Sequence, residues 1–390
     1  MEEVNLPETL NNLIAQGKMK RLKWIILWQE WKFINEAFVT NWVVPLGPNV
    51  EGFEKDLASY IGQNKSVVAL SSGTAAIHLG LIQLGVKQGD DVLCQSFTFA
   101  ASANPIAYLG ATPVFIDSET DTWNLDPLFL EKAIIDRKEK TGKFPKVIIP
   151  VHLYGMPAKM DEILSISKKY DIPVLEDAAE ALGSEYNGQK CGTFSAFGVL
   201  SFNGNKMITT SGGGALICRT PEEAVKTKFY ATQARDNAPH YQHSEIGYNY
   251  RMSNICAGIG RGQMFVLNEH VERRREIHEI YKKLLFGLKG ISVFQGPSEK
   301  FNSNYWLTCI LVDEKETGFS REQLRLKLES EDIESRPLWK PMHLQPVFAN
   351  APFYGNGTSE RLFEIGLCIP SGPTLSDNDI IRVVNVIQSM

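Results

Sequence analysis

The sequence has little that suggests disulfide bonds, a metal site or a membrane span. Its six cysteines (94, 191, 218, 256, 309 and 368) are scattered and form no CxxC pair, so we expect core or strand residues in a reducing cytoplasm, not a disulfide framework or a zinc site. The apolar patch WIILW (24–28) lies between Lys23 and Glu30 and is far too short to span a bilayer. No small-residue cleavage site follows it, which argues against a secretory signal. We expect an amphipathic helix there that packs on the body of the protein or on a partner.

Positive charge is also scarce. The chain has 40 Lys and Arg against 45 Asp and Glu, a net charge of -5, so no general basic surface suggests nucleic acid as a partner. An anionic ligand needs a local site instead. With 390 residues the chain is long enough for a large core and more than one domain, and it contains no internal repeat or low-complexity linker.

Short apolar runs alternate with helical patterns from about residue 50 to 220. This alternation predicts a mostly parallel sheet with helices on both faces. A long helical pattern over about 252–286 suits a connector, and the remainder predicts a smaller α+β domain. We therefore expect an N-terminal segment (1–50), a large α/β domain (51–265), and a connecting helix with a small C-terminal α+β domain (266–390). The predicted strands are SVVAL (66–70), DVLC (91–94), TPVFID (112–117), KVIIPVHL (146–153), IPVLEDA (172–178), AFGVLSF (196–202), GALICR (214–219) and YWLTCILV (305–312).

Three segments follow predicted strands, at the sheet edge where ligands bind in open α/β sheets. Gly73 and Thr74 would open a helix whose free N–H groups can hold a phosphate. Asp177 follows a second strand, and Lys206 sits in a polar turn before three glycines at 212–214. Each feature alone has a simpler interpretation. The segment at Gly73 and Thr74 can be an ordinary helix cap, and Asp177 can cap a helix over AAEALG. Lys206 can be a solvated surface lysine, and the glycines at 212–214 can form a bend. Together they match what an aldehyde cofactor with a phosphate tail requires.

Six segments carry a resemblance to a known family: SSGTAAIHLGL (71–81), QSFTFAASANPI (95–106), VHLYG (151–155), LEDAAEALGS (175–184), SFNGNK (201–206) and IGYNYRMSN (246–254). They resemble the sugar aminotransferases of the DegT/DnrJ/StrS family, which are pyridoxal-phosphate enzymes of the aspartate-aminotransferase fold (fold type I). The resemblance runs from about residue 33 to the C-terminus. SRPLWKPMH (335–343) and LCIPSG (367–372) resemble the branch that aminates UDP-4-keto-6-deoxy-N-acetylglucosamine in bacillosamine and exopolysaccharide synthesis.

The resemblance implies two catalytic roles at the cofactor, pyridoxal 5'-phosphate. Lys206 matches the lysine whose amine bonds to the cofactor aldehyde and, once released, moves the proton between substrate carbon and cofactor carbon. Asp177 matches the acid that pairs with the pyridinium nitrogen and keeps it protonated, a proton that an asparagine would not hold.

The resemblance also implies further cofactor contacts. The Ser201 hydroxyl joins the Gly73 and Thr74 backbone at the phosphate. Phe99 matches the aromatic residue that stacks on the ring, although a core phenylalanine is the simpler interpretation. Glu180 matches a position, glutamine in many relatives, that contacts the phenolic oxygen. Asn249 matches a residue that reaches the phosphate from the other subunit, so a homodimer with sites at the interface is expected.

For the substrate, Arg336 is the first candidate to contact a nucleotide-sugar diphosphate or ring, because the arginine fork donates paired hydrogen bonds. Trp339 and His343 are weaker candidates. The histidines of HYQH (240–243) lack a third ligand cluster, which favours a substrate-facing loop over a metal site.

The N-terminus departs from the family pattern. Relatives usually have a segment like SPPHMxGxE where this chain reads KMKRLKWIILWQEW (18–31). The chain either handles the sugar poorly or uses this region differently.

The expected protein is a cytoplasmic homodimer that moves an amino group from L-glutamate to the C4 ketone of a nucleotide-linked 6-deoxy-keto-sugar. Two alternatives stay open. Pyridoxal-phosphate sugar dehydratases resemble this chain but carry histidine where it has Lys206, so the lysine favours transamination. A regulatory or scaffold protein that binds the cofactor without turnover is the other.

Overall fold

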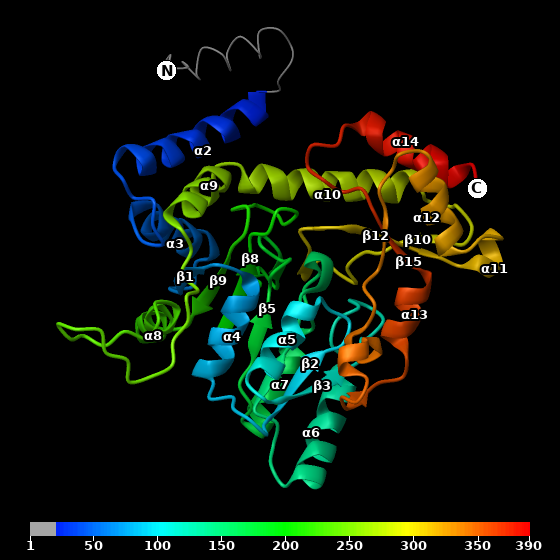
Figure 1. The fold of residues 1–390 in the computed structure, drawn as a ribbon. Helices are drawn as coiled ribbons and strands as arrows, with labels where there is room; N and C mark the ends of the chain where they lie inside the picture. Colours follow the sequence, from blue (N-terminus) through cyan, green and yellow to red (C-terminus); the bar gives the residue numbers. More distant parts are fainter. Residues whose placement is uncertain (1–20) are drawn as a thin grey trace.

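The computed structural model describes residues 21–390 and places a large sheet at the centre of the chain (Figure 1). Across this sheet the strands follow the order β1 (Ser66–Leu70), β9 (Gly214–Cys218), β8 (Phe197–Ser201), β5 (Leu175–Asp177), β4 (Val147–Ile149), β2 (Asp91–Gln95), β3 (Thr112–Ile116) and β14 (Phe353–Tyr354). Parallel bridges from Ile148 to Val174 and from Val151 to Asp177 join its two halves. In the described chain β9 runs antiparallel to both neighbours and the other pairs are parallel, so the predicted mostly parallel sheet is confirmed.

Both faces of the large sheet are covered, because successive side chains of a strand point to opposite faces. In β1, Val68 and Leu70 pack with the residues of α4 and α8, whereas Val67 and Ala69 pack with those of α3 and α9. Strands buried on both faces read as continuous apolar runs, which is why they could be recognised in the sequence.

The helices of the described chain connect the strands and cover the sheets. They are α2 (Arg21–Val39), α3 (Pro48–Ile61), α4 (Gly73–Gln83), α5 (Ala100–Tyr108), α6 (Pro127–Thr141), α7 (Met160–Tyr170), α8 (Pro221–Ala231), α9 (Asn254–Met264), α10 (Leu267–Leu284), α11 (Glu314–Thr317), α12 (Arg321–Ser330), α13 (Thr358–Ile365) and α14 (Asp377–Gln388), with short 3-10 helices at Leu153–Gly155, Met342–Leu344 and Pro346–Phe348. Among residues 21–390, none of the helices combines the length and the apolar character that a membrane crossing needs.

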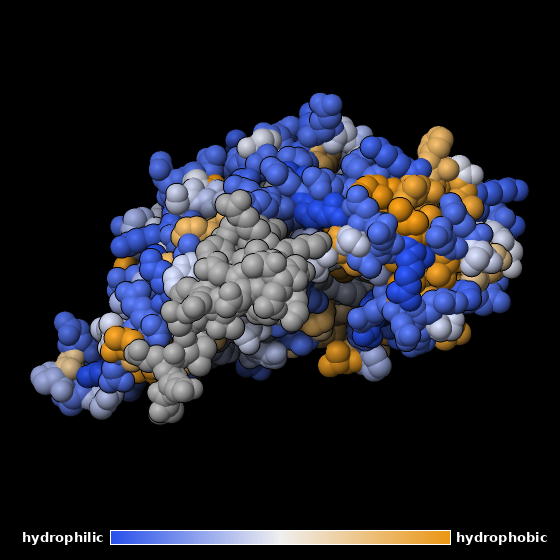
Figure 2. Space-filling model, turned by 90° about the horizontal axis from the view of Figure 1, so that it is seen from above, coloured by the Kyte–Doolittle hydropathy of each residue, from blue (hydrophilic) through white to orange (hydrophobic). Residues whose placement is uncertain are grey.

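A smaller antiparallel sheet follows in the C-terminal part of the chain. Its order is β10 (Ile291–Val293), β12 (Thr308–Val312), β15 (Gly366–Ile369) and β13 (Arg336–Pro337), and a short sheet of β6 (Glu185–Tyr186), β7 (Gln189–Lys190) and β11 (Phe301–Asn302) lies apart from it. α10 and α14 pack on it through one shared apolar core. Seen from above, the surface of the molecule is mainly hydrophilic, with apolar residues gathered on the side of α14 (Figure 2).

The long helix predicted over 252–286 is wrong in one respect, because it is broken into α9 and α10 at Phe265 and Val266. α9 is held close to α2 and α3 by glycines: a Cβ on Gly260 would lie 2.7 Å from the Phe53 ring, and one on Gly262 2.6 Å from the Glu30 nitrogen. α10 instead packs on the small sheet. The break between α9 and α10 lets α9 pack on α2 and α3 while α10 packs on the small sheet.

The N-terminal helix was expected from the apolar patch at 24–28, and α2 confirms the helix. It packs on α9, with Phe33 and Ala37 buried. Residues 18–20 of the atypical KMKRLKWIILWQEW segment lie outside the described residues, as do the side chains of 21–27.

The C-terminal part of the chain also contributes to the large sheet. β14 pairs in parallel with β3, through hydrogen bonds from the Phe115 N–H to the Pro352 carbonyl (2.8 Å) and from the Asp117 N–H to the Tyr354 carbonyl (3.0 Å). The buried Asp117 carboxylate then accepts N–H groups at the start of α13, including that of Gly357 at 2.8 Å. The segment between β13 and β14 is thus attached to the small sheet at one end and to the large sheet at the other.

The domain boundaries at 50 and 265 stay a prediction.

Candidate active site

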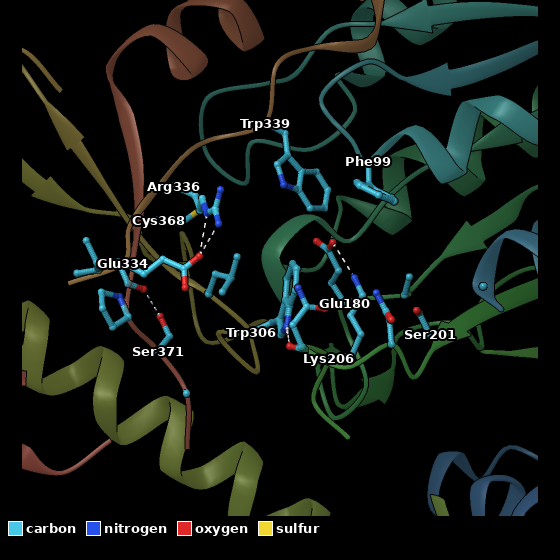
Figure 3. Close-up of a pocket in the computed structure, with 18 of the residues that line it drawn as sticks. Phe99, Glu180, Ser201, Lys206, Trp306, Glu334, Arg336, Trp339, Cys368 and Ser371 are labelled. Carbon is cyan, nitrogen blue, oxygen red and sulfur yellow. Dashed lines mark hydrogen bonds and ion pairs between the residues drawn. The ribbon is translucent and has the colours of Figure 1, made fainter. Parts of the chain in front are cut away.

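A cavity of about 1130 Å³ lies at the carboxyl ends of β5 and β8 and is closed on the opposite side by β13 and β15 of the small sheet (Figure 3). The structure brings most of the predicted site residues to this one space. Those that line it are Gly73, Thr74, Phe99, Asp177, Glu180, Ser201, Lys206, Arg336 and Trp339.

Lys206 occupies the turn between β8 and β9. The turn is closed by backbone bonds from the Lys206 N–H to the Asn203 carbonyl (3.0 Å) and from the Thr210 N–H to the Phe202 carbonyl (2.9 Å). Only 12% of the lysine side chain is exposed, and its Nζ lies 3.2 Å from a Glu180 oxygen and 4.1 Å from the centre of the Trp306 ring (Figure 3). The interpretation as a solvated surface lysine is therefore wrong.

The glycines after Lys206 allow close packing of the backbone. A Cβ on Gly214 would lie 2.3 Å from the Gly73 nitrogen, and a Cβ on Gly213 would lie 2.2 Å from the Thr210 hydroxyl oxygen. A Cβ on Gly212 meets open space. Gly214 thus lets β9 begin directly against the start of α4, and Gly213 lets the turn pass close to Thr210, beyond what a simple bend requires.

The start of α4 presents donors to the cavity. The Ser72 hydroxyl accepts the Ala75 N–H (3.0 Å) as an N-cap, so the helix-cap interpretation also holds. The N–H groups of the first helical turn, at Gly73 and Thr74, have no carbonyl partner within the helix. A Cβ on Gly73 would lie 3.3 Å from Ser201 Cβ, so Ser201 stands next to these donors. Backbone N–H groups at a helix start with a hydroxyl beside them are suited to a phosphate.

Asp177 ends β5 and is 4% exposed. Its carboxylate accepts the Ser102 hydroxyl at 2.6 Å and the Ala179 N–H at 3.1 Å. Residues 178–184 form turns, not a helix, so the interpretation of Asp177 as the cap of a helix over AAEALG is wrong. Among the described ion pairs, this buried carboxylate has no cationic partner. A basic group supplied by a ligand would therefore suit it.

Glu180 lies between Lys206 and the Tyr154 backbone. One carboxylate oxygen is 3.2 Å from Lys206 Nζ, and the other accepts the Tyr154 N–H at 2.7 Å. Burial raises the pKa of the Glu180 carboxyl to about 7; the Lys206 charge and the Tyr154 N–H oppose this rise, and the Asp177 charge adds to it. The group thus holds its proton near neutral pH more readily than an ordinary glutamate.

The raised pKa makes the stability of the cofactor-free protein depend on pH. Between the ordinary pKa of 4.5 and the folded pKa of about 7 the folded chain binds more protons at Glu180 than the unfolded chain, so this contribution to stability is lost as pH rises through 7. The shift corresponds to about 3 kcal/mol. We expect Glu180→Gln, which keeps an acceptor for Tyr154, to gain about this much relative to wild type from about pH 4 to about pH 8. Urea unfolding at each pH measures it, and a constant difference contradicts it.

Phe99 and Trp339 form an aromatic part of the cavity wall. Their ring centres are 5.5 Å apart, and Phe99 precedes α5 with 59% of its surface exposed. The interpretation of Phe99 as a core residue is therefore wrong. Arg336, on β13, is paired with Glu334 at 2.7 Å, and both side chains are largely exposed at the far side of the cavity (Figure 3).

The structure does not bring His343 or Asn249 to the cavity of this chain. His343 lies on the 3-10 helix Met342–Leu344, which turns the chain into the body, where its ring stacks on Phe353 (3.7 Å) and its Nδ1 is 2.7 Å from the Ser96 hydroxyl. Asn249 forms a backbone bridge with Thr232. A role of Asn249 in the site of another subunit stays a prediction.

The two histidines of HYQH are exposed on a loop. His240 is 3.3 Å from the Gln242 side chain, and His243 bonds to the Gln233 carbonyl at 2.8 Å. Within the part of the chain that the structure describes, no group of three or more His, Cys, Asp or Glu side chains is arranged to hold a metal ion. Neither histidine lines the cavity.

Two residues next to the Lys206–Glu180 pair were missed by the sequence analysis. The Trp306 indole donates to the Asn205 carbonyl at 2.7 Å and lies over the lysine amine. Tyr154 has a positive φ of 54°, donates its N–H to Glu180, and accepts the Trp339 N–H at its hydroxyl (2.9 Å). The VHLYG segment was a signal for Tyr154, whereas no local pattern distinguishes Trp306 from a strand residue.

Pyridoxal 5'-phosphate is the cofactor that this chemistry implies, and the residues present fit it. A buried carboxylate without a cation, a buried lysine amine and a helix start beside a hydroxyl surround one cavity. These are the partners for a pyridinium nitrogen, an aldehyde and a phosphate. The sheet order and this site define a pyridoxal-phosphate-dependent transferase of fold type I.

Comparison with known proteins places the chain further. Residues 28–388 match the DegT/DnrJ/EryC1/StrS aminotransferase family, and the chain belongs to this family. It is 51% identical over 363 residues to EpsN of Bacillus subtilis (strain 168), named as a pyridoxal phosphate-dependent aminotransferase, covering 92% of each chain. It is 36% identical to GDP-perosamine synthase of Escherichia coli O157:H7, covering 91% of this chain and 93% of that protein.

Solved structures agree with the fold. The crystal structure of a DegT DnrJ EryC1 StrS aminotransferase from Brucella abortus superimposes with a TM-score of 0.87 at 28% identity, covering 100% of this chain and 99% of that one. The predicted fold class, the assignment as an aminotransferase and the pyridoxal 5'-phosphate cofactor are thereby confirmed.

Proposed function

We propose that the chain transfers an amino group from L-glutamate to the C4 ketone of a nucleotide-linked 4-keto-6-deoxy sugar, as a cytoplasmic homodimer that serves polysaccharide or glycan synthesis. The proposed acceptor is UDP-2-acetamido-2,6-dideoxy-4-keto-hexose. The observation that carries the proposal is that Lys206 and Arg336 line one continuous cavity.

The size of the cavity supports a large substrate. Its volume of about 1130 Å³ lies slightly above the range of about 300–1,000 Å³ that ligand pockets usually have. An amino acid alone needs much less space. The arginine at the far side suits a diphosphate, and the aromatic side chains of Phe99 and Trp339 suit an apolar sugar face.

The relatives support the sugar assignment. GDP-perosamine synthase is named for a nucleotide-linked amino sugar, and a further relative, from Shewanella sediminis at 31% identity, is named UDP-4-amino-4-deoxy-L-arabinose--oxoglutarate aminotransferase. The second name pairs a 4-amino sugar with the keto acid of glutamate, which is the exchange we propose here.

The residues of the chain divide the work. The bound cofactor supplies an aldehyde and an electron-accepting ring. In each half-reaction Lys206 Nζ would accept a proton from one carbon and deliver it to the other: from the substrate carbon to the cofactor carbon in the first, and from the cofactor carbon to the sugar carbon in the second. The Asp177 carboxylate, which Ser102 orients, would stabilise a proton on the ring nitrogen of the cofactor. The N–H groups at the helix start, at Gly73 and Thr74, would hold its phosphate. The Glu180 carboxyl, 3.2 Å from Lys206 Nζ, provides a group beside the lysine amine that can bind a proton.

The visible absorption spectrum of the purified holoenzyme tests the proposal. We expect a yellow band that fades when L-glutamate is added and returns when the UDP-4-keto-sugar is added. Fading without return on any nucleotide-linked keto-sugar contradicts the acceptor class. A band that ignores glutamate and glutamine contradicts the donor and favours the regulatory alternative, in which cofactor is held without turnover.

Arg336 is proposed to bind the nucleotide part of the sugar. We expect Arg336→Ala to raise the sugar-nucleotide KM by about 10- to 100-fold, the value of a charge-assisted hydrogen bond, while the glutamate half-reaction stays unchanged. Glu334→Gln is the matched control: it removes the exposed ion-pair partner of Arg336, and such pairs contribute little. Equal effects on both half-reactions would contradict this role.

The homodimer and the role of Asn249 can be tested together. Large apolar side chains are exposed on the elements around α2 and on the loop before Asn249, including Phe38 (61%), Val39 (77%) and Ile246 (82%), which favours an interface there. If Asn249 completes the partner's phosphate site, mixing inactive Lys206→Ala with a weakened Asn249→Ala subunit restores activity, because one site per hybrid dimer is intact. No restoration after verified subunit exchange rejects the shared site.

A further inference from the structure

Two cysteines face each other beside the cavity. Cys309 on β12 lies directly opposite Cys368 on β15, and their Sγ atoms are 3.8 Å apart. Directly opposed residues in antiparallel strands have Cα atoms about 4.5 or 5.5 Å apart. Both values lie in the range of about 4.4–6.8 Å that a disulfide spans. Closure to an S–S bond of about 2.0 Å therefore needs only a small movement of the two side chains.

The two thiols differ in their access to the solvent. Cys368 lines the cavity (Figure 3) and is 6% exposed, whereas Cys309 does not line it and is 1% exposed. Burial raises the pKa of the Cys309 thiol well above its ordinary value. A reagent thus meets Cys368 first, and it comes through the substrate cavity. The other cysteines do not line this cavity: Cys94, Cys191, Cys218 and Cys256.

We propose that Cys309 and Cys368 form a thiol–disulfide modification site in the cavity wall, which takes low-molecular-weight disulfides such as oxidised glutathione. The Cys368 thiolate attacks one sulfur of the small disulfide and releases one thiol. The Cys309 thiol then loses its proton, which passes to the departing thiolate, and its sulfur attacks the mixed disulfide at Cys368 and releases the second thiol. The two cysteines lose two electrons and two protons, and the small disulfide gains both as two thiols.

The modification acts on the substrate side of the cavity. Cys368 is paired across β15 and β13 with Arg336, and the residues that follow it, Ile369 to Ser371, line the cavity. The cysteine pair packs in one cluster with Tyr154, Trp306 and other apolar residues. Drawing the two sulfurs together displaces β15 against these neighbours. We expect weaker binding of the sugar nucleotide and a smaller effect on the glutamate half-reaction.

The test starts from the reduced holoenzyme, incubated with oxidised glutathione and divided for two measurements. Mass spectrometry of peptides prepared without reduction is expected to show a Cys309–Cys368 cross-link that disappears with dithiothreitol. Kinetics are expected to show a sugar-nucleotide KM raised about tenfold or more, since a displacement of about 1 Å can have effects of this size. Cys309→Ser and Cys368→Ser are expected to resist the change, and Cys256→Ser, at a half-buried cysteine on α9, to remain sensitive.

Each outcome decides the proposal. No cross-link in the wild type under conditions that modify Cys256, or a loss of activity that persists in both Cys309→Ser and Cys368→Ser, overturns the site. A cross-link with unchanged kinetics overturns its effect on the substrate. The kinetic measurement rests on the proposed function, whereas the cross-link and the glutamate-dependent spectrum are measured without any sugar. Failure of the proposed acceptor is therefore seen separately from failure of the cysteine site.

Discussion

Lys206→Ala is expected to lower steady-state turnover about a thousandfold or more. In the proposed mechanism this residue supplies both the amine that bonds to the cofactor aldehyde and the group that moves a proton in each half-reaction. Positioned proton transfer alone contributes about 10²–10⁴-fold. The rate is measured with glutamate and the keto-sugar nucleotide, and the yellow band of the holoenzyme is expected to shift or vanish. Intact steady turnover in this variant would contradict the mechanism.

The Lys206→Ala protein is expected to remain folded. Glu180 loses the amine 3.2 Å away, but the lysine charge opposes the raised pKa of this carboxyl, so its removal leaves Glu180 protonated and neutral near pH 7. Thermal unfolding of the cofactor-free variant checks this. A large loss of stability would mean that the kinetic effect comes from unfolding, and Lys206→Arg, which keeps the charge, then separates the two causes.

Asp177→Asn is expected to lower kcat by about 10²-fold or more while the protein still folds. The asparagine keeps an oxygen that accepts the Ser102 hydroxyl, but it removes the negative charge that, in the proposed mechanism, stabilises a proton on the ring nitrogen of the cofactor. Single-turnover measurement of the glutamate half-reaction shows the loss directly. The matched control is Ser102→Ala, which removes the 2.6 Å hydrogen bond and leaves the carboxylate, so we expect a smaller loss. Equal losses would assign the main effect to orientation.

Much of the fold could be predicted because its strands are buried on both faces. The runs at 66–70 and 112–117 match β1 and β3 closely, since each has an apolar interior and polar residues at its ends. The run at 146–153 does not: only Val147–Ile149 is strand, and the chain then turns into the 3-10 helix at Leu153–Gly155, where Tyr154 has a positive φ. That turn is set by tertiary contacts of Tyr154 with Glu180 and Trp339, which no local pattern contains.

The site could be predicted where chemistry leaves a local mark and not where it depends on distant contacts. Lys206 stood out because its turn follows a predicted strand at the same sheet edge as Asp177 and the helix start at Gly73, and these three features together match one cofactor. Trp306 lies 100 residues later in the chain and reaches the lysine through the packing of the small sheet. His343 shows the opposite error. It was predicted to bind substrate because it lies near Arg336 and Trp339 in the sequence, but the 3-10 helix at Met342–Leu344 turns its side chain into the body, where it bonds to Ser96.

The attachment of the segment between β13 and β14 to both sheets constrains how the enzyme can move. A hinge motion that opened the cavity by swinging the small sheet away would have to break the bonds from Phe115 and Asp117 to the β14 segment, or stretch the chain that carries Trp339. The two parts are therefore braced against rigid-body separation. We therefore expect substrates to enter by rearrangement of side chains and loops at the rim, and small-angle scattering to show the same overall dimensions with and without a bound sugar nucleotide.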